Sequence, residues 1–511
     1  MTQPPAEQPA DSRLPQTITF YSPVQDAEQP KNEISIPVGK DYPPNDAGNA
    51  KRFLDICSGG VRYVPAEKQW YYFDGSRWIA DTMCMVQQLA SAALSFSYQA
   101  EADYLKEQGN YKALPQTEKQ SLRAGNISSL QNCLNMAALS AAISPDKFDA
   151  DPYWFHAKNG AINMKTYDVL LYHDKRQFFT RTAGASLTPE GLSKDAGSPQ
   201  CPRWIQFVKE CCGYDEELYN YLQRAAGYSI LTGDIREQKV FCLLGAGRNG
   251  KSLFINTLAR VAGDYAAKIE ASVLCVNRFG DKDSEMSKEL FRIRGSRFVY
   301  SNEFGRSSTL NENFVKTITD GGHIVCRTLY KESIEYTPTC TLWFSTNHMP
   351  ALQAMDEGIR RRIVVIPFRN TLTEDAIDRG LPEKLLEEAD AILCWLVQGY
   401  YRYTVHSLKP PAAVTQATAC YFEEQDMYQV FLNEHYIPDA DGKVYAKSIY
   451  QTYQHWCAEN GEKPVSSIRL GKELQRLGIN RKKDMHGLFY YLQEKPHDEI
   501  TESHDENMTT L

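Results

Sequence analysis

Apolar residues along this 511-residue chain change their spacing several times, and each change marks a different kind of element. Across residues 238–370, short apolar runs alternate with segments of helical periodicity, which is typical of an α/β domain with a parallel sheet. The predicted strands are the runs KVFCLL, RFVYSN, TLWFST and IVVIPF. The segment SLFINTLARVAG, shortly after the first run, has the spacing of an amphipathic helix.

Upstream, residues 46–235 predict an α+β domain. Alternating aromatic and β-branched residues around Asp74-Gly75 predict a β-hairpin whose aromatic side chains form a small core rather than a base-stacking surface. Residues 83–145 have helical spacing with one polar break, and the segment from Trp154 to Arg181 returns to short strands and turns. Two further helices are predicted near the end of this domain. The central α/β domain is predicted to span residues 236–410.

Downstream, a helical stretch ends at KPPAAV, which is interpreted as a linker, and residues 420–495 predict a small helix-rich module. Residues 1–45 are rich in Pro, Gln, Asp and Glu and have no sustained periodicity, so they predict a disordered arm. The polar, acidic residues 496–511 predict a disordered tail.

Composition narrows the class of protein. The formal net charge of −8 gives no whole-chain sign of nucleic-acid binding, so any basic surface must be local. The thirteen cysteines include no CxxC pair and no metal-like spacing, which predicts reduced thiols. The N-terminus lacks the pattern of a signal peptide, and no apolar run approaches the ~20 residues that span a bilayer. We therefore expect a soluble cytoplasmic protein with no membrane partner.

The stretch GAGRNGKS, directly after the first predicted strand, matches the phosphate-binding pattern G-x-x-x-x-G-K-[ST]. Glycines let backbone N–H groups approach phosphates, and the following helix offers its positive end. Lys251 can reach the β- and γ-phosphates of ATP, and the Ser252 hydroxyl can bind Mg²⁺. The predicted nucleotide-binding residues are Gly245, Ala246, Gly247, Arg248, Asn249, Gly250, Lys251 and Ser252.

Polar residues follow the next strands. Glu303 stands where a carboxylate would orient the attacking water or support the metal, and Asn347 stands where an amide would lie beside the γ-phosphate. The cluster Arg360 to Arg362 could supply a guanidinium to a neighbouring subunit's γ-phosphate. The alternatives are a surface glutamate, a turn-forming asparagine and a solvated basic cluster.

The ordered segments GAGRNGKS, FVYSNEF, KTITDGG, TLWFSTNHMP and DEGIRRRIVVIPF resemble the superfamily 3 helicases. Among these helicases, they are most similar to the phage and plasmid primase–helicase family, which includes the poxvirus replication helicase. The resemblance covers roughly residues 50–490. It implies an AAA+ type ATPase that assembles as a hexameric ring around DNA, binds ATP between subunits and moves 3′ to 5′ on one strand.

The resemblance also implies roles for individual residues. Lys251 and Ser252 would bind phosphate and Mg²⁺, Glu303 would serve catalysis and the metal, and Asn347 would be the sensor. Arg361 and Arg362 match the family's arginine pair, and either could be the finger, whereas Arg360 occupies a position where an aromatic residue is expected. The segment from Lys316 to Lys331 corresponds to a DNA-contacting hairpin, with phosphate contacts expected from Lys316, Arg327 and Lys331.

Two departures from the family pattern stand out. His323 replaces an aspartate that often follows the Gly-Gly pair, which leaves the role of that position open. The segment SNE has one carboxylate where many relatives have two acidic residues, so metal binding would depend more on Ser252 and water, with help from the Asn302 amide.

Residues 443–483 carry nine Lys and Arg against three Glu, in a chain that is acidic overall. Two helical patterns followed by a basic hairpin suggest a winged helix that binds DNA, although a solvated basic face or a protein-docking surface would have the same composition. The candidate DNA-binding residues are Arg469, Lys472, Arg476, Arg481, Lys482 and Lys483.

The sequence therefore predicts an ATP-dependent replicative DNA helicase of a phage, plasmid or related mobile element, acting in a bacterial or phage-infected cell on single-stranded and forked DNA. About 45 low-complexity residues precede the first predicted domain, which is too few for the N-terminal primase domain that relatives often carry. No primer synthesis is therefore expected from this chain, and a separate primase or polymerase is a possible partner. Two other functions remain open. One is a DNA-stimulated AAA+ ATPase that loads or moves without unwinding, and the other is a replication-origin binding protein.

Overall fold

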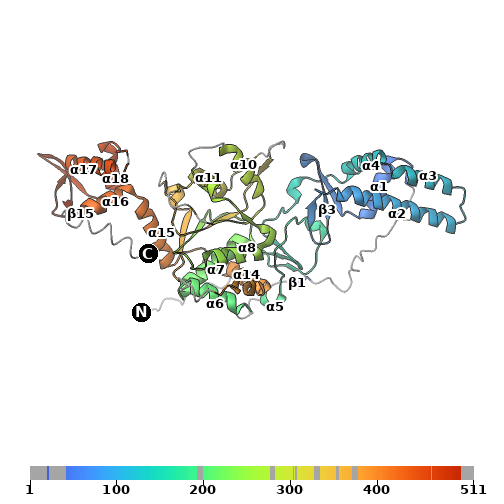
Figure 1. The fold of residues 1–511 in the computed structure, drawn as a ribbon, viewed down its shortest axis with the longest axis horizontal. Coiled ribbons are helices and arrows are strands. Elements are labelled where there is room, and N and C mark those ends of the chain that lie inside the picture. The colour runs from blue at the N-terminus through green and yellow to red at the C-terminus, as the bar shows by residue number, and fades with distance from the viewer. Residues whose placement is uncertain are drawn as a thin grey trace, which may run out of the picture.

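The computed structural model describes residues 20–21, 42–192, 199–276, 282–302, 304, 308–326, 334–352, 356–370, 378–461 and 463–495. In this part of the chain a central α/β body lies between an N-terminal helical part and a C-terminal module (Figure 1). Both predicted disordered segments lie outside the described residues, except for 20–21 and 42–45. All thirteen cysteines are free thiols, which confirms the sequence-based prediction. Among the described helices, none is long and apolar enough to cross a membrane.

A five-stranded parallel sheet forms the centre of the fold, and it confirms the predicted α/β character. Its strands lie in the order β14–β8–β13–β10–β9. They are β8 (Val240–Leu244), β9 (Ala266–Lys268), β10 (Phe298–Asn302), β13 (Thr341–Thr346) and β14 (Ile363–Pro367). All four predicted strand runs are present. The residues of β13 are buried throughout, as expected for an inner parallel strand covered on both faces.

Alternate residues of these strands enter two different cores. Phe241 and Trp343 face one core, where they pack with helices such as α7, α8 and α14. Val240 and Leu342 face the other core, which helices such as α10, α11 and α15 help to close. The helices around the sheet are α5 (Pro189–Leu192), α6 (Pro202–Cys211), α7 (Glu216–Leu231), α8 (Lys251–Ala262), α9 (Ala271–Leu274), α10 (Lys282–Arg292), α11 (Glu312–Thr319), α12 (Glu357–Arg360), α13 (Leu381–Leu386), α14 (Ala389–His406) and α15 (Ala412–Gln425).

The N-terminal helical part contains α1 (Asp46–Cys57), α2 (Met85–Glu107), α3 (Leu114–Ala124) and α4 (Ile127–Ser140). These helices share a core with an antiparallel sheet of β2 (Val61–Val64), β3 (Gln69–Phe73) and β4 (Trp78–Ala80). The predicted hairpin is β3–β4, and Gly75 has a positive φ of 104° at its turn. Trp78, the first residue of β4, is buried and packs against the rings of Phe73 and Phe178, in agreement with the expected aromatic core.

A second small sheet joins this part to the centre. Its strands lie in the order β1–β7–β6–β5, and they are β1 (Phe20–Tyr21), β5 (Trp154–Ala157), β6 (Gly160–Asn163) and β7 (Val169–Leu170). Phe155 of β5 stacks on Tyr265, with ring centroids 4.7 Å apart, inside the core that also contains α6 and α7. Residues 154–192 and 199–231 therefore contribute to the core of the central sheet, across the predicted domain boundary at 235.

The C-terminal module contains α16 (Met427–His435), α17 (Ala446–Glu459) and α18 (Ser467–Arg476). Its strands are β15 (Tyr436–Pro438), β16 (Val444–Tyr445), β17 (Arg481–Asp484), β18 (Gly487–Tyr490) and β19 (Leu492–Glu494). The two helices and the basic hairpin predicted here are α17, α18 and β17–β18. The predicted linker is wrong after Pro411, because that residue caps α15 and Val414 is already buried. Proline suits a helix start, where no N–H donor is needed.

Candidate functional site

The carboxyl ends of four parallel strands meet at one edge of the central sheet. Leu244, the last residue of β8, pairs with Thr346 of β13 on one side and with Pro367 of β14 on the other. Strand β10 ends beside them, because Asn302 pairs with Ser345. In open α/β sheets, ligands bind at this edge. The loop after β8 is the predicted phosphate loop, so the sequence pattern and the topology point to the same place.

Two glycines of this loop occupy positions that exclude a side chain. A Cβ atom on Gly245 would lie 2.1 Å from Nδ2 of Asn249 and 2.5 Å from the carbonyl oxygen of Phe368. Gly250 has a φ of 83°, and a Cβ atom there would lie 2.9 Å from the Phe207 ring. The loop thus folds tightly against the protein on one side. On the other side, Ala246, Gly247 and Arg248 are exposed to solvent.

Lys251 begins helix α8, and its side chain is only 5% exposed. Its Nζ atom, which carries three N–H donors, lies within hydrogen-bonding distance of the backbone oxygens of Gly245 (2.7 Å) and Ala246 (3.2 Å) and of Oδ1 of Asn249 (2.8 Å) and Asn347 (2.9 Å). Lys251 therefore connects the loop after β8 to the residue that follows β13. A phosphate would offer this ammonium group a stronger, charge-assisted partner than these neutral oxygens.

Of the other predicted residues of this site, the structure describes Ser252, Asn347 and Asn302 but not Glu303. Ser252 is exposed in the first turn of α8, where its hydroxyl is accessible. Asn347 is also exposed, and Oγ of Ser345 lies 3.4 Å from Oδ1 of Asn302 at the end of β10. Glu303 lies outside the described residues. Within the described parts of the chain, no group of three His, Cys, Asp or Glu side chains could hold a metal ion.

The two predicted arginines differ sharply. Arg362 is 3% exposed, and its guanidinium donates to Oγ1 of Thr319 (2.8 Å) and to the carbonyl oxygen of Gly358 (2.6 Å). It also forms an ion pair with Asp320. Arg361 is exposed, and within the described residues its guanidinium makes no hydrogen bond or ion pair. The structure therefore gives Arg362 a structural role within the chain and leaves Arg361 available to a partner.

Arg361 lies at the amino ends of the parallel strands, whereas the phosphate loop lies at their carboxyl ends. It precedes β14, whose first residue, Ile363, pairs with Val240, the first residue of β8. The five residues of each strand span about 16 Å at ~3.3 Å per residue. An extended arginine side chain is much shorter than this span. Arg361 therefore cannot reach the phosphate loop of its own chain in this arrangement.

The predicted DNA-contacting segment consists of a helix and a separate hairpin. Strands β11 (Ile324–Cys326) and β12 (Ile334–Tyr336) pair antiparallel, as predicted, while Arg327 and Lys331 lie outside the described residues. Lys316 is on α11 instead of the hairpin, and its Nζ lies 2.5 Å from Oδ2 of Asp356. Sequence patterns alone do not identify Asp356, which also caps α12 through a hydrogen bond from the N–H of Ile359.

The candidate DNA-binding residues of the C-terminal module lie on two elements. Arg481, Lys482 and Lys483 are exposed along β17. Arg469, Lys472 and Arg476 are exposed on α18, where their spacing of three and four residues places them along one face. Arg476 differs from the other five because it forms ion pairs with Glu473 and Asp426.

Comparisons with known proteins agree with this arrangement of motifs. Residues 50–213 match the family model described as "D5 N terminal like". Residues 243–362, which include the phosphate loop and the arginine cluster, match a family of unknown function, DUF5906.

The chain is also similar to curated viral proteins. It is 29% identical over 251 residues to "Putative helicase L207/L206" of Acanthamoeba polyphaga mimivirus, covering 45% of this chain and 26% of that protein. It is 23% identical over 362 residues to "Putative primase C962R" of African swine fever virus, covering 64% of this chain and 35% of that protein. The chain thus spans about a quarter to a third of the length of these relatives.

A solved structure, the apo form of the NrS-1 C-terminal region, superposes on 89% of this chain and 100% of its own, with a TM-score of 0.47 and 12% sequence identity.

Proposed function

This chain belongs to the D5-like family of superfamily 3 helicases and primases, and we propose that it is an ATP-dependent DNA helicase that replicates a phage, plasmid or related mobile element. The observation that carries the proposal is the position of Lys251. Its ammonium group joins the glycine-rich loop after β8 to Asn347 after β13, at the sheet edge where ligands bind. This is the position at which a lysine would meet the β- and γ-phosphates of ATP.

Bound Mg²⁺–ATP would supply a phosphoanhydride whose hydrolysis releases free energy. The residues of this chain that would hold it are the exposed backbone of Ala246 to Arg248, the Lys251 ammonium group and the Ser252 hydroxyl. Asn347 would contact the γ-phosphate from the neighbouring strand. Glu303 follows Asn302 at the end of β10, so its sequence position agrees with the proposed role of orienting water.

Oligomerisation completes the proposed site. Because the length of the sheet separates Arg361 from its own phosphate loop, Arg361 can stabilise a transferring phosphate only in the site of a second chain. Repetition of such a head-to-tail contact generates a ring when the rotation closes. We therefore propose a homo-oligomer, with a hexamer as the expected form, in which Arg361 is the finger and Arg362 holds its base.

Two surfaces would contact DNA. The β11–β12 hairpin would line the channel of the ring, and the basic residues of α18 and β17 would hold the strand or the fork outside it. Positive side chains bind DNA phosphates largely without regard to sequence, and each such interaction steepens the salt dependence of binding. On this proposal, the C-terminal module is a winged helix that binds DNA.

The proposal is tested by measuring ATP hydrolysis and strand displacement on a 3′-tailed duplex with the same preparation. We expect both activities in the wild type and neither in Lys251→Ala. Hydrolysis that DNA accelerates without strand displacement would indicate the non-unwinding ATPase instead. Sequence-specific DNA binding that persists in the absence of any hydrolysis would indicate the origin-binding protein.

A further inference from the structure

Asp426 lies at the junction between the central body and the C-terminal module. It caps the end of α15, which packs against β14, and the start of α16, the first helix of the module. Figure 1 shows these two helices at the base of the module. Its side chain is 3% exposed. Oδ1 accepts hydrogen bonds from the N–H groups of Tyr428 (3.2 Å) and Gln429 (3.4 Å), which caps α16. A carboxylate this well buried requires compensation for its lost hydration.

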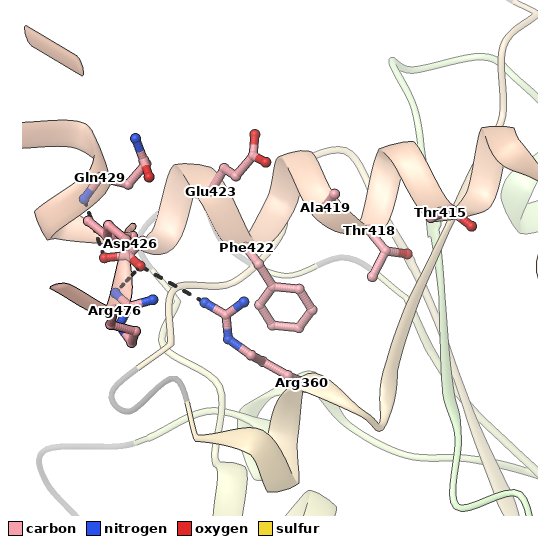
Figure 2. A pocket seen from close by; sticks show the side chains of 10 residues that line it. Arg360, Thr415, Thr418, Ala419, Phe422, Glu423, Asp426, Gln429 and Arg476 are labelled. Carbon is pink, nitrogen blue, oxygen red and sulfur yellow. Dashed lines mark hydrogen bonds and ion pairs between the residues drawn. The ribbon is translucent and has the colours of Figure 1, made fainter. Parts of the chain in front are cut away.

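Two arginines from different parts of the chain provide that compensation (Figure 2). Arg476 of α18, in the module, forms an ion pair with Oδ2 of Asp426. Arg360 of α12, in the central body, approaches the same oxygen to 4.0 Å, and its guanidinium lies over the Phe422 ring, 5.1 Å from the centroid. These groups line a cavity of about 350 Å³ between the two parts.

Each of the two arginines is next to residues with a proposed function, the arginine finger in one case and the DNA-binding face of α18 in the other. Arg360 immediately precedes Arg361, the proposed finger. Arg476 lies on the same face of α18 as Arg469 and Lys472, so a DNA phosphate bound to this face would compete with Asp426 for the guanidinium. Arg476 is accessible to such a phosphate, because its side chain is 43% exposed.

We infer that Asp426 is a positioning residue through which DNA bound by the C-terminal module sets the position of Arg361. When a phosphate draws Arg476 away, the buried carboxylate retains Arg360 as its cationic partner and draws it closer. A shift of Arg360 moves the end of α12 and therefore the next residue, Arg361. This inference rests on the proposed function, and it adds a connection between DNA binding and the arginine finger.

Asp426→Asn tests the role of the negative charge without removing the helix cap. Asparagine caps helices about as well as aspartate, so the variant keeps the hydrogen bonds to α16 while losing the attraction to both arginines. We expect basal ATP hydrolysis within about twofold of the wild type. DNA affinity should be unchanged or higher, because Asp426 no longer competes with a phosphate for Arg476. The acceleration of hydrolysis by saturating DNA should fall at least about fivefold, the lower end of typical coupling between sites.

Two further variants sharpen the test. Arg476→Gln breaks the same ion pair from the module side and should reduce the DNA-dependent acceleration similarly, which keeps the inference testable if Asp426→Asn does not fold. Glu473→Gln is the matched control. It removes the other carboxylate paired with Arg476, 2.6 Å from Nε, but leaves the ion pair with Asp426 in place, and it should keep the acceleration.

The possible outcomes are distinct. Unchanged acceleration in both Asp426→Asn and Arg476→Gln would overturn the inference, and so would a proportional loss of basal and stimulated rates, which indicates a purely structural role. A wild type whose hydrolysis does not respond to DNA would also overturn it while leaving the ATPase in place. A wild type that does not hydrolyse ATP would instead refute the proposed function.

Discussion

The neighbouring arginines 361 and 362 should respond in opposite ways to replacement by alanine. Arg362 is buried and bonded to Thr319, Gly358 and Asp320, whereas Arg361 is exposed on the surface. Arg362→Ala should therefore destabilise the protein. Arg361→Ala should leave the fold intact and stop the chemistry.

The magnitude for Arg362 follows from these partners. Removing one member of a buried ion pair costs about 3–5 kcal/mol, but Asp320 is 50% exposed, so water can partly replace the missing charge. We expect a loss of about 3 kcal/mol, which corresponds to a fall in Tm of roughly 6–12 °C for a domain of this size. For Arg361, the expected change in stability lies within about 0.5 kcal/mol. Its turnover should fall by roughly 10³-fold or more, as for other arginine fingers.

The assay combines thermal unfolding with ATP hydrolysis by each variant and by mixtures of variants. When Arg361→Ala and Lys251→Ala are mixed, the first variant supplies an intact Lys251 and the second an intact Arg361. A site between two such chains would then contain both residues. Random assembly would restore about a quarter of the sites. An arginine that acts within its own chain would restore none.

Three results would refute this reasoning. Full turnover in Arg361→Ala would exclude it as the finger. Turnover that stays at zero in the mixture, although the two variants assemble together, would exclude action between chains. A wild-type Tm in Arg362→Ala would show that its buried hydrogen bonds and ion pair do not stabilise the fold.

Three further predictions concern other parts of the molecule. ATP at about 100 times its Kd should stabilise the wild type by about 2.7 kcal/mol against thermal unfolding, and Lys251→Ala by much less. Burial lowers the pKa of His156 to about 4, so as the pH falls the unfolded chain binds a proton at this histidine before the folded chain does. The free energy of unfolding should therefore fall by up to about 3 kcal/mol between pH 6.5 and pH 4. Denaturant unfolding should show a smaller fall in His156→Gln. Replacing Lys482 and Lys483 by Gln should weaken DNA binding and reduce its salt slope by about one for each phosphate that is no longer neutralised, measured by titration at several salt concentrations.

The elements that the sequence predicts well are those whose signal is local. Each central strand is a short apolar run, and the phosphate loop is a contiguous pattern, so both can be identified without knowing what they touch. Helix α1 has a weaker local signal, the N-cap residue Asn45, whose Oδ1 accepts a hydrogen bond from the N–H of Gly48. The linker prediction is wrong because two prolines mark a helix start as readily as a hinge.

Residues whose roles depend on distant partners cannot be assigned in this way. Arg361 and Arg362 are equivalent in the sequence, and only the fold shows that one guanidinium is buried against α11. The sequence around Lys316 suggests a hairpin, whereas Lys316 is on helix α11 and its side chain is paired with Asp356, forty residues away along the chain. Asp426 carries no motif at all, because its importance comes from two arginines that approach it from separate parts of the chain.

The three consecutive arginines before β14 point in three different directions. Arg360 reaches Asp426 at the base of the C-terminal module, and Arg362 reaches Asp320, which immediately precedes the Gly-Gly turn leading into β11. Arg361, between them, faces solvent. A finger placed in this way cannot move far without disturbing both of its neighbours. Arg360 ends the short helix α12, and Arg361 and Arg362 follow it directly. In the proposed ring, contact between Arg361 and the next chain's phosphate would therefore be coupled to both DNA-contacting surfaces.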